Sequence, residues 1–131
     1  MTYFAQINDS SIVINVIKVD DSDTPNEAAG IAFCKSLLGS DTNWVQTSKT
    51  GDIRHRFAGI GMKYDSTNNV FLTLSEYPSW VLNTSTWEFN APVALPADAG
   101  FNDDKTEFIE YDWDEDTTSW TNRTVIDLTY L

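Results

Sequence analysis

The sequence has little cysteine, little positive charge and no long apolar run. Cys34 is the only cysteine among 131 residues, which excludes a disulfide bond within the chain and a cysteine-built zinc site. Eight basic residues face twenty acidic ones, giving a formal net charge of -12. Nucleic acids are bound mainly by clustered lysine and arginine, so we expect no nucleic-acid partner. No apolar run approaches the roughly 20 residues of a membrane span. Residues 1–9 also lack the pattern of a signal peptide. We therefore expect a soluble protein that has no membrane partner and is not exported by the Sec route.

The length and composition predict one compact domain over residues 1–131. Hydrophobic residues make up 41% of the chain and aromatic residues 13%, which is enough apolar material for a core without disulfides or metals. The proline-rich segment 91–100 is the place where an internal boundary would fall, because it is unsuited to a central strand.

The N-terminal part predicts a β-hairpin and one helix. Apolar, β-branched residues at 4–7 and 12–19 flank a polar segment, which is typical of a hairpin. A capping residue, Pro25 and an acidic first turn predict a helix over 25–38, and Gly39 fits its end. Short strands are expected next at 44–47 and 53–57.

The C-terminal part carries aromatic pairs seven positions apart, separated by turn-rich segments. Asn, Thr, Ser and Asp between the members favour turns over a helix interior. In a hairpin with an even-numbered loop such residues lie opposite each other, and the contact adds about 0.2–1 kcal/mol. The fold class is therefore α+β and mainly β, with successive short hairpins fastened by three pairs: Tyr64 with Phe71, Trp80 with Trp87, and Trp113 with Trp120.

Residues that could form a metal or catalytic site do not match a known pattern. Asp112, Asp114 and Asp116 alternate like the first ligands of a calcium loop, but the glycine and the bidentate glutamate that such a loop requires are missing. His55 lies between two arginines, and Cys34 is typical of a small buried hydrophobe. No carboxylate can be assigned to the buried environment that a glycosidase acid needs. We expect neither an enzyme nor a bound cofactor or metal.

Two sets of residues could bind partners. Arg54 and Arg56 belong to a local basic stripe that could dock on an acidic partner, or could be a solvated strand face. Tryptophan is a preferred anchor at protein interfaces, but the tryptophans could instead clamp hairpins over a thin core. The predicted partner-binding residues are Arg54, Arg56, Trp80 and Trp87, and the predicted glycan-stacking residues are Trp113 and Trp120.

Several long motifs resemble one group of proteins. The stretches FAGIGMKYDSTNNVF, YPSWVLNTSTWEFNAPV and YDWDEDTTSW, preceded by FAQI at 4–7, are similar to those of small structural proteins of marine cyanobacterial tailed phages. The resemblance covers most of the chain outside the helix and the last eleven residues. Glu76 departs from the group, in which a proline is common at this position, and residues 101–110 lengthen the connector before the last hairpin.

The resemblance implies a non-enzymatic virion component. We expect a protein that is made in the host cytoplasm and decorates the outer surface of the capsid, with the major capsid protein or tail proteins as partners. A tail or tail-fibre component that binds host glycans is the first alternative. A soluble carbohydrate-binding module is the second.

Overall fold

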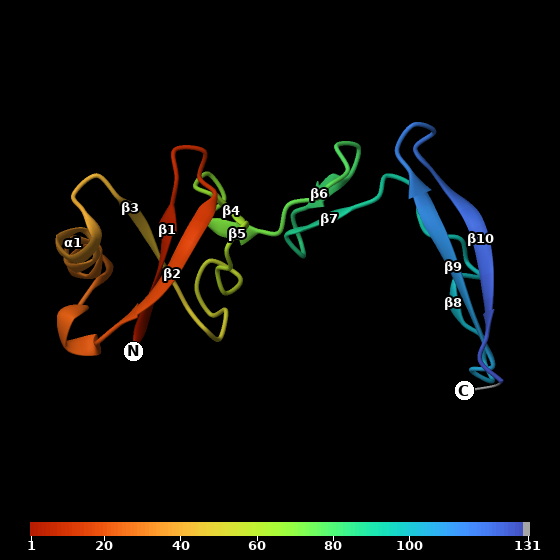
Figure 1. Cartoon of the computed structure of the whole chain (residues 1–131), viewed down its shortest axis with the longest axis horizontal. Coiled ribbons are helices and arrows are strands. Elements are labelled where there is room, and N and C mark those ends of the chain that lie inside the picture. The colour runs from red at the N-terminus through yellow and green to blue at the C-terminus, as the bar shows by residue number, and fades with distance from the viewer. Residues whose placement is uncertain (130–131) are drawn as a thin grey trace. The chain divides into compact units, whose positions relative to one another are not determined.

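The computed structural model describes residues 1–129, and β-strands dominate it (Figure 1). The predicted mainly β class, with one helix and several antiparallel hairpins, is confirmed. Within these residues the elements are β1 (Thr2–Ile7), β2 (Val13–Val19), the 3-10 turn Asp21–Asp23, α1 (Glu27–Leu38), β3 (Asn43–Thr47), β4 (Lys63–Asp65), β5 (Val70–Leu72), β6 (Val81–Asn83), β7 (Glu88–Asn90), β8 (Gly100–Phe101), β9 (Glu107–Asp114) and β10 (Ser119–Asp127).

The residues group into two compact units. Unit 1 contains residues 1–74 and 83–88, and unit 2 contains residues 75–82 and those from 89 onward. The proline-rich segment 91–100, where the sequence suggests a boundary, lies inside unit 2. Each unit is therefore described by itself.

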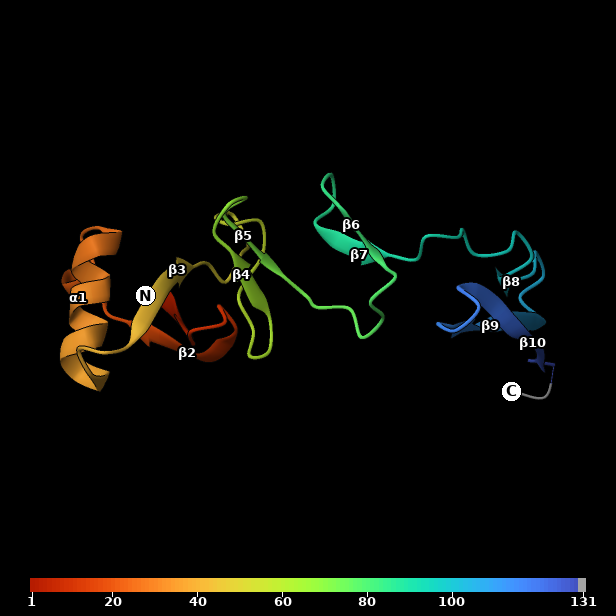
Figure 2. The same ribbon diagram turned by 90° about the horizontal axis from the view of Figure 1, so that it is seen from above.

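The first core of unit 1 lies between α1 and a three-stranded antiparallel sheet in the order β2-β1-β3 (Figure 2). Phe4 of β1 is fully buried there with Cys34 of α1 and Trp44 of β3. Gly30 lets the helix approach this closely, because a Cβ atom at that position would lie 2.1 Å from the Phe4 ring. The absence of a side chain at Gly30 thus leaves room for the Phe4 ring beneath the helix.

The second core of unit 1 lies on the other face of the same sheet. Ala5 follows Phe4 in β1 and points to the opposite side. It packs there with Val45 of β3, Ala58 and the fully buried Phe71 of β5. The β4–β5 hairpin therefore covers the face that α1 leaves free.

Two elements of unit 1 differ from the sequence prediction. The helix begins at Glu27, two residues later than expected, because the side chain of Asn26 caps it by accepting a hydrogen bond from the N–H of Ala29 at 2.8 Å. The strand expected over 53–57 is wrong. Arg54 and His55 have φ angles of 50° and 72°, in the left-handed region, and interrupt any extended ladder there.

The hairpins β4–β5, β6–β7 and β9–β10 share one turn of four residues. Each turn follows an Asp or Asn whose side-chain oxygen accepts hydrogen bonds from the N–H groups two and three residues later, at 2.8–3.4 Å. Each turn ends on a residue with φ near 50–60°. The first residues of these motifs are Asp65, Asn83 and Asp114, and the last are Asn69, Trp87 and Thr118.

This shared turn confirms two of the three predicted aromatic pairs. Tyr64 is opposite Phe71 with ring centroids 5.3 Å apart, and Trp113 is opposite Trp120 at 5.1 Å. Both pairs lie one position outside the residues that close the turn.

The third predicted pair, Trp80 with Trp87, is wrong. Trp80 precedes β6, and Trp87 is the last residue of the turn, with a φ of 56°. Counted from Asn83, which opens the turn, the positions equivalent to the other two pairs belong to Leu82 and Phe89.

A further hairpin, β8–β9, lies where residues 101–110 are expected to lengthen the connector. Phe101 is opposite Phe108, again seven positions on, and their ring centroids are 4.8 Å apart. The side-chain oxygen of Asn102 accepts hydrogen bonds from the N–H groups of Thr106 and Glu107. Asn102 thus also closes its turn with a side-chain oxygen, but it accepts from N–H groups four and five residues later, not two and three.

Unit 2 is built on the antiparallel sheet β10-β9-β8. A bulge between Thr121 and Thr124 interrupts the pairing of β9 with β10. Beyond the bulge, β10 continues to Asp127. All fully buried residues of the described chain lie in unit 1 and none in unit 2.

Candidate partner-binding residues

Arg54, a predicted partner-binding residue, is engaged inside unit 1. Its guanidinium lies 3.0 Å from the Glu27 carboxylate of α1. It also donates hydrogen bonds to the carbonyl of Gln46 in β3 and to the side chain of Asn69, at 2.8 and 2.9 Å. Only 16% of its side chain is exposed. Arg54 therefore ties the helix, the sheet and the β4–β5 turn together, which leaves it little surface for an acidic partner.

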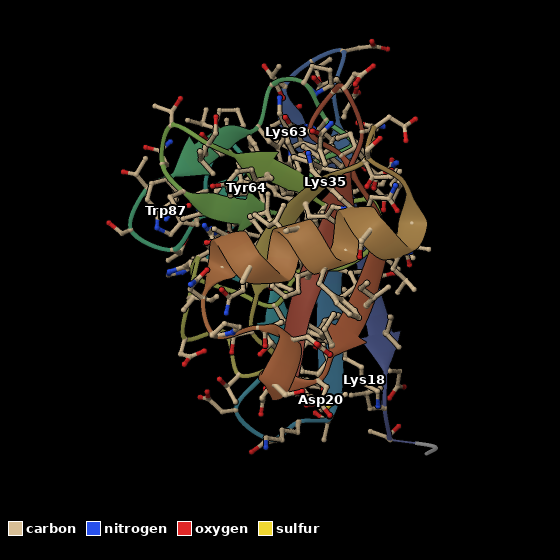
Figure 3. All side chains as sticks on the ribbon, turned by 90° about the vertical axis from the view of Figure 1, so that its left-hand side faces the viewer. Lys18, Asp20, Lys35, Lys63, Tyr64 and Trp87 are labelled. Carbon is tan, nitrogen blue, oxygen red and sulfur yellow. The ribbon has the colours of Figure 1, made fainter. Side chains whose placement is uncertain are left out.

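Arg56 and Trp87, two further predicted partner-binding residues, meet at the β6–β7 turn. Trp87 is the last residue of that turn, and Arg56 binds its backbone. Arg56 donates hydrogen bonds to the carbonyls of Thr86 and Trp87 at 3.0 and 2.8 Å. The Trp87 ring, labelled in Figure 3, meets the ring of His55 edge to face at 6.4 Å. His55 is thus an aromatic packing partner at this turn.

Trp80, the fourth predicted partner-binding residue, joins Trp113 and Trp120 in an aromatic cluster of unit 2. The three ring centroids are 5.1–6.2 Å apart and their planes are inclined by 65–87°. Tyr77 lies against Trp80 at 5.3 Å. At these separations ring edges contact ring faces directly, so each ring gives part of its stacking surface to a neighbour. The structure therefore brings one predicted protein anchor together with both predicted glycan-stacking residues.

Glu115 connects this cluster to the segment before β6. Its carboxylate accepts hydrogen bonds from the N–H and the hydroxyl of Ser79 at 2.9 and 2.6 Å, and from the indole N–H of Trp113 at 2.8 Å. The Ser79 hydroxyl and then the Trp113 indole hold the pKa of Glu115 below its ordinary value. The sequence does not reveal this contact, because Ser79 lies 36 positions before Glu115.

The three indole nitrogens of the cluster differ in their hydrogen bonding. Trp113 donates to Glu115, and Trp120 donates to the carbonyl of Val93 at 2.9 Å. The Nε1 of Trp80 is buried and has no hydrogen-bond partner among the described residues. An unpaired buried donor costs about 1–3 kcal/mol, so Trp80 contributes through its ring alone.

Asp98 forms a second polar contact in unit 2. Its carboxylate accepts hydrogen bonds from the Tyr111 hydroxyl at 2.6 Å and from Arg123 at 2.8 Å. Tyr111 and then Arg123 lower the pKa of Asp98. Hydrogen bonding to Asp98 raises the pKa of Tyr111. The three residues hold the 91–100 segment against the sheet.

The aspartates that resemble the start of a calcium loop have a structural use. Asp114 opens the β9–β10 turn, and Asp112 accepts a hydrogen bond from Asn122 at 3.3 Å. Within residues 1–129, no group of three or more His, Cys, Asp or Glu side chains is arranged to hold a metal ion.

In the same part of the chain, no helix has the length and apolar character needed to cross a membrane.

Unit 1 has an open concavity of about 280 Å³. It is lined by residues of the N-terminus, by Gln46 near the end of β3 and by the loop that follows, including Lys49 and Asp52. The hydroxyls of Ser48 and Thr50 lower the pKa of Asp52, which keeps its carboxylate ionised. Cys34 of α1, by contrast, is buried against Phe4 and Trp44 of the sheet, and this burial raises the pKa of its thiol.

Comparison with known proteins gives no relative of this chain. No protein-family model matches it, and neither a curated protein nor a solved structure shows significant similarity.

Proposed function

We propose that the protein is a non-enzymatic structural component of a phage particle and that it decorates the capsid exterior. The observation that supports the proposal is the place in the fold of the motifs that resemble those of cyanophage structural proteins. Asp65 opens the β4–β5 turn, and Trp113, Glu115 and Trp120 build the aromatic cluster. The resemblance therefore falls on residues that form the hairpin scaffold.

Exposed apolar side chains of unit 2 support binding to other virion proteins, with the major capsid protein as the first partner. Apolar surface rimmed by polar residues is characteristic of protein interaction sites. The exposed apolar residues of this unit are Val81, Val93, Leu95, Phe101, Val125 and Ile126.

Mass spectrometry of purified particles tests the proposal directly. Hundreds of copies per particle are expected for a protein that follows a head lattice, whereas about a dozen or fewer would place it at the tail or at a vertex. Particles that lack the protein would contradict both virion functions.

A tail component that binds host glycans is the second candidate. It is favoured by Trp113 and Trp120, whose side chains are partly exposed in an acidic unit. A glycan array would show binding that Trp113→Ala removes and Trp87→Ala, a change in unit 1, leaves intact. Equal binding by both variants would argue against stacking at this cluster.

A further inference from the structure

The two faces of the β10-β9-β8 sheet are unlike each other. Directly paired residues of antiparallel strands point to the same face, so Phe101, Phe108 and Ile126 form one apolar row across all three strands. Phe101 is 62% exposed and Ile126 38% exposed. We call this side the Phe101 face.

The opposite face is partly covered by other parts of unit 2. Tyr111 and Trp113 point to it, being an odd number of positions from Phe108 along β9. The segment that contains Val93 and Asp98 lies there, held by the hydrogen bonds of Trp120 and Tyr111. On this face Val125 is 44% exposed, but its partner Ile109 is half-buried and Gly100 next to Ile109 has no side chain. The Phe101 face therefore differs in presenting apolar side chains on all three strands.

Acidic side chains border the apolar row on the Phe101 face. Glu110 and Asp112 follow Phe108 at two and four positions in β9 and therefore share its face, and both are exposed. Asp103 and Asp104, also exposed, lie in the turn that follows Phe101. The Phe101 face therefore has an apolar centre and an acidic border.

Most of the negative charge of the chain lies in unit 2. Eleven acidic and two basic residues give unit 2 a formal charge of -9, whereas nine acidic and six basic residues give unit 1 a charge of -3. One of the two basic residues, Arg123, is already paired with Asp98. The field around the Phe101 face is therefore negative.

From this geometry we infer that the Phe101 face is the docking surface for a protein partner that presents apolar side chains bordered by lysine and arginine. The inference deepens the proposed function and rests on it, because it names the surface by which the protein binds another virion protein. Phe101 and Ile126 enter the apolar part of the interface. Glu110 and its acidic neighbours pair with the basic border and select the partner.

Charge favours this occupant over a second copy of the chain. Two units of -9 repel each other, and the same field disfavours nucleic acids and anionic lipids. A basic partner gains from the same field, since opposite potentials speed association and suppress wrong partners.

A defined peptide tests the surface on the full chain. The probe is a short, fluorescently labelled peptide of alternating leucine and lysine, and anisotropy reports its binding. We expect Phe101→Ser combined with Ile126→Ser to weaken binding about tenfold or more, as for loss of an interface anchor. The matched control is Leu37→Ser on α1, because Leu37 is 61% exposed in unit 1. This control should bind like the unchanged protein.

Charge reversal tests the acidic border. Glu110→Lys should weaken binding and reduce its salt dependence, whereas Glu88→Lys, in unit 1, should do neither. A peptide of alternating serine and lysine should bind more weakly than the leucine peptide, because it lacks apolar anchors.

Several outcomes would overturn the inference. One is equal binding by the Phe101→Ser/Ile126→Ser variant and the Leu37→Ser control. Another is equal binding of a leucine–glutamate peptide. A third is a concentration-dependent dimer in sedimentation that the double variant abolishes, which would make a second copy the occupant.

Particle experiments separate this inference from the proposed function. If the protein is present in particles and the double variant is incorporated at the same copy number as the unchanged chain, the docking surface is wrong and the proposed function stands. If particles lack the protein, the proposed function fails, and the peptide measurements still decide what the Phe101 face binds.

Discussion

Unit 1 and unit 2 use different means to hold short strands together. In unit 1, α1 and the β4–β5 hairpin cover opposite faces of one sheet, and Phe4 and Phe71 are fully buried at the two contacts. In unit 2 no described side chain is fully buried, and tryptophan rings, turn side chains and the Asp98 and Glu115 carboxylates hold the strands. The same turn motif thus occurs in a unit with a hydrophobic core and in a unit without one.

The difference shows what a hairpin needs besides its turn. Isolated two-stranded hairpins are marginal in water, and hydrophobic burial supplies most of the missing free energy. Unit 1 obtains that burial from its own sheet. Unit 2 keeps an apolar row exposed, so binding at the Phe101 face would supply burial that the free unit lacks.

The largest expected effect is the loss of stability when a buried phenylalanine of unit 1 is truncated, compared with an exposed one of unit 2. Phe4→Ala should lower the free energy of unfolding of unit 1 by about 3–5 kcal/mol, because it leaves a cavity between α1 and the sheet. Phe101→Ala, at an exposed position of unit 2, should cost less than about 1 kcal/mol. Urea unfolding followed by circular dichroism measures both, and similar losses would remove the distinction between the units.

The tryptophan cluster allows a sharper test within unit 2. Trp113→Phe should destabilise it by about 1–3 kcal/mol, because the change removes the indole hydrogen bond to Glu115. Trp80→Phe should cost clearly less, since it removes an unpaired buried N–H. Thermal unfolding followed by near-UV circular dichroism distinguishes the two. A larger loss for Trp80→Phe would mean that its indole has a partner.

The shared turn predicts the same effect in both units. Asp65→Ala in unit 1 and Asp114→Ala in unit 2 should each cost about 1 kcal/mol, because each removes two hydrogen bonds to backbone N–H groups. Asp65→Asn and Asp114→Asn are the controls and should retain most of the stability, since Asn83 has this role in β6–β7. Chemical denaturation measures all four variants, and a loss in only one unit would contradict a common turn.

Acid should weaken the contact of Glu115 with the tryptophan cluster. The Ser79 and Trp113 hydrogen bonds lower the pKa of Glu115 in the folded state, so their contribution to stability is present above the unfolded-state pKa and is lost as the pH falls through the folded-state pKa. Near-UV circular dichroism during acid titration follows this loss. Glu115→Gln should reduce the pH dependence of the signal, and an unchanged titration curve would assign it to other carboxylates.

The smallest expected effect concerns the last residue of the turn. Thr118 has a φ of 48°, which is unfavourable for a β-branched residue, whereas Asn69 occupies the same position in β4–β5. Thr118→Asn should therefore stabilise unit 2 by less than about 1 kcal/mol. Asn69→Thr should destabilise unit 1 by more, because it also removes the side-chain oxygen that accepts hydrogen bonds from Arg54 and Tyr64. Thermal unfolding measures both shifts. A decrease in stability for Thr118→Asn would show that the threonine side chain has a compensating contact.

Local features of the fold could be predicted from the sequence, because they depend on residues a few positions apart. The strand that includes Trp44 and the pairing of Trp113 with Trp120 are examples. The predicted register of β6–β7 is wrong because Asn83, which opens the turn, decides it and not the spacing of the tryptophans. The β8–β9 hairpin is not evident from the sequence because Asn102 closes a longer turn, through N–H groups four and five residues later.

The surroundings of the candidate partner-binding residues could not be predicted. Arg54 is paired with Glu27, 27 positions earlier, and Trp80 packs against residues that follow it by more than 30 positions. Such contacts depend on how the hairpins fold back on one another, which spacing within a short segment does not reveal. Arg54 and Trp80, which are expected to be free to bind a partner, are therefore engaged in contacts within the chain.

The order of pairing within each sheet also bears on how the protein folds during synthesis. The hairpins join neighbouring strands across a few residues, and hairpin formation takes about 1–10 μs. Sheet β2-β1-β3 instead needs β3 to return to β1 after α1 has been made. Contacts between distant residues slow folding. On the ribosome, each later hairpin can form as soon as its second strand emerges, whereas β1 must wait with an unpaired edge until Thr47 has left the exit tunnel.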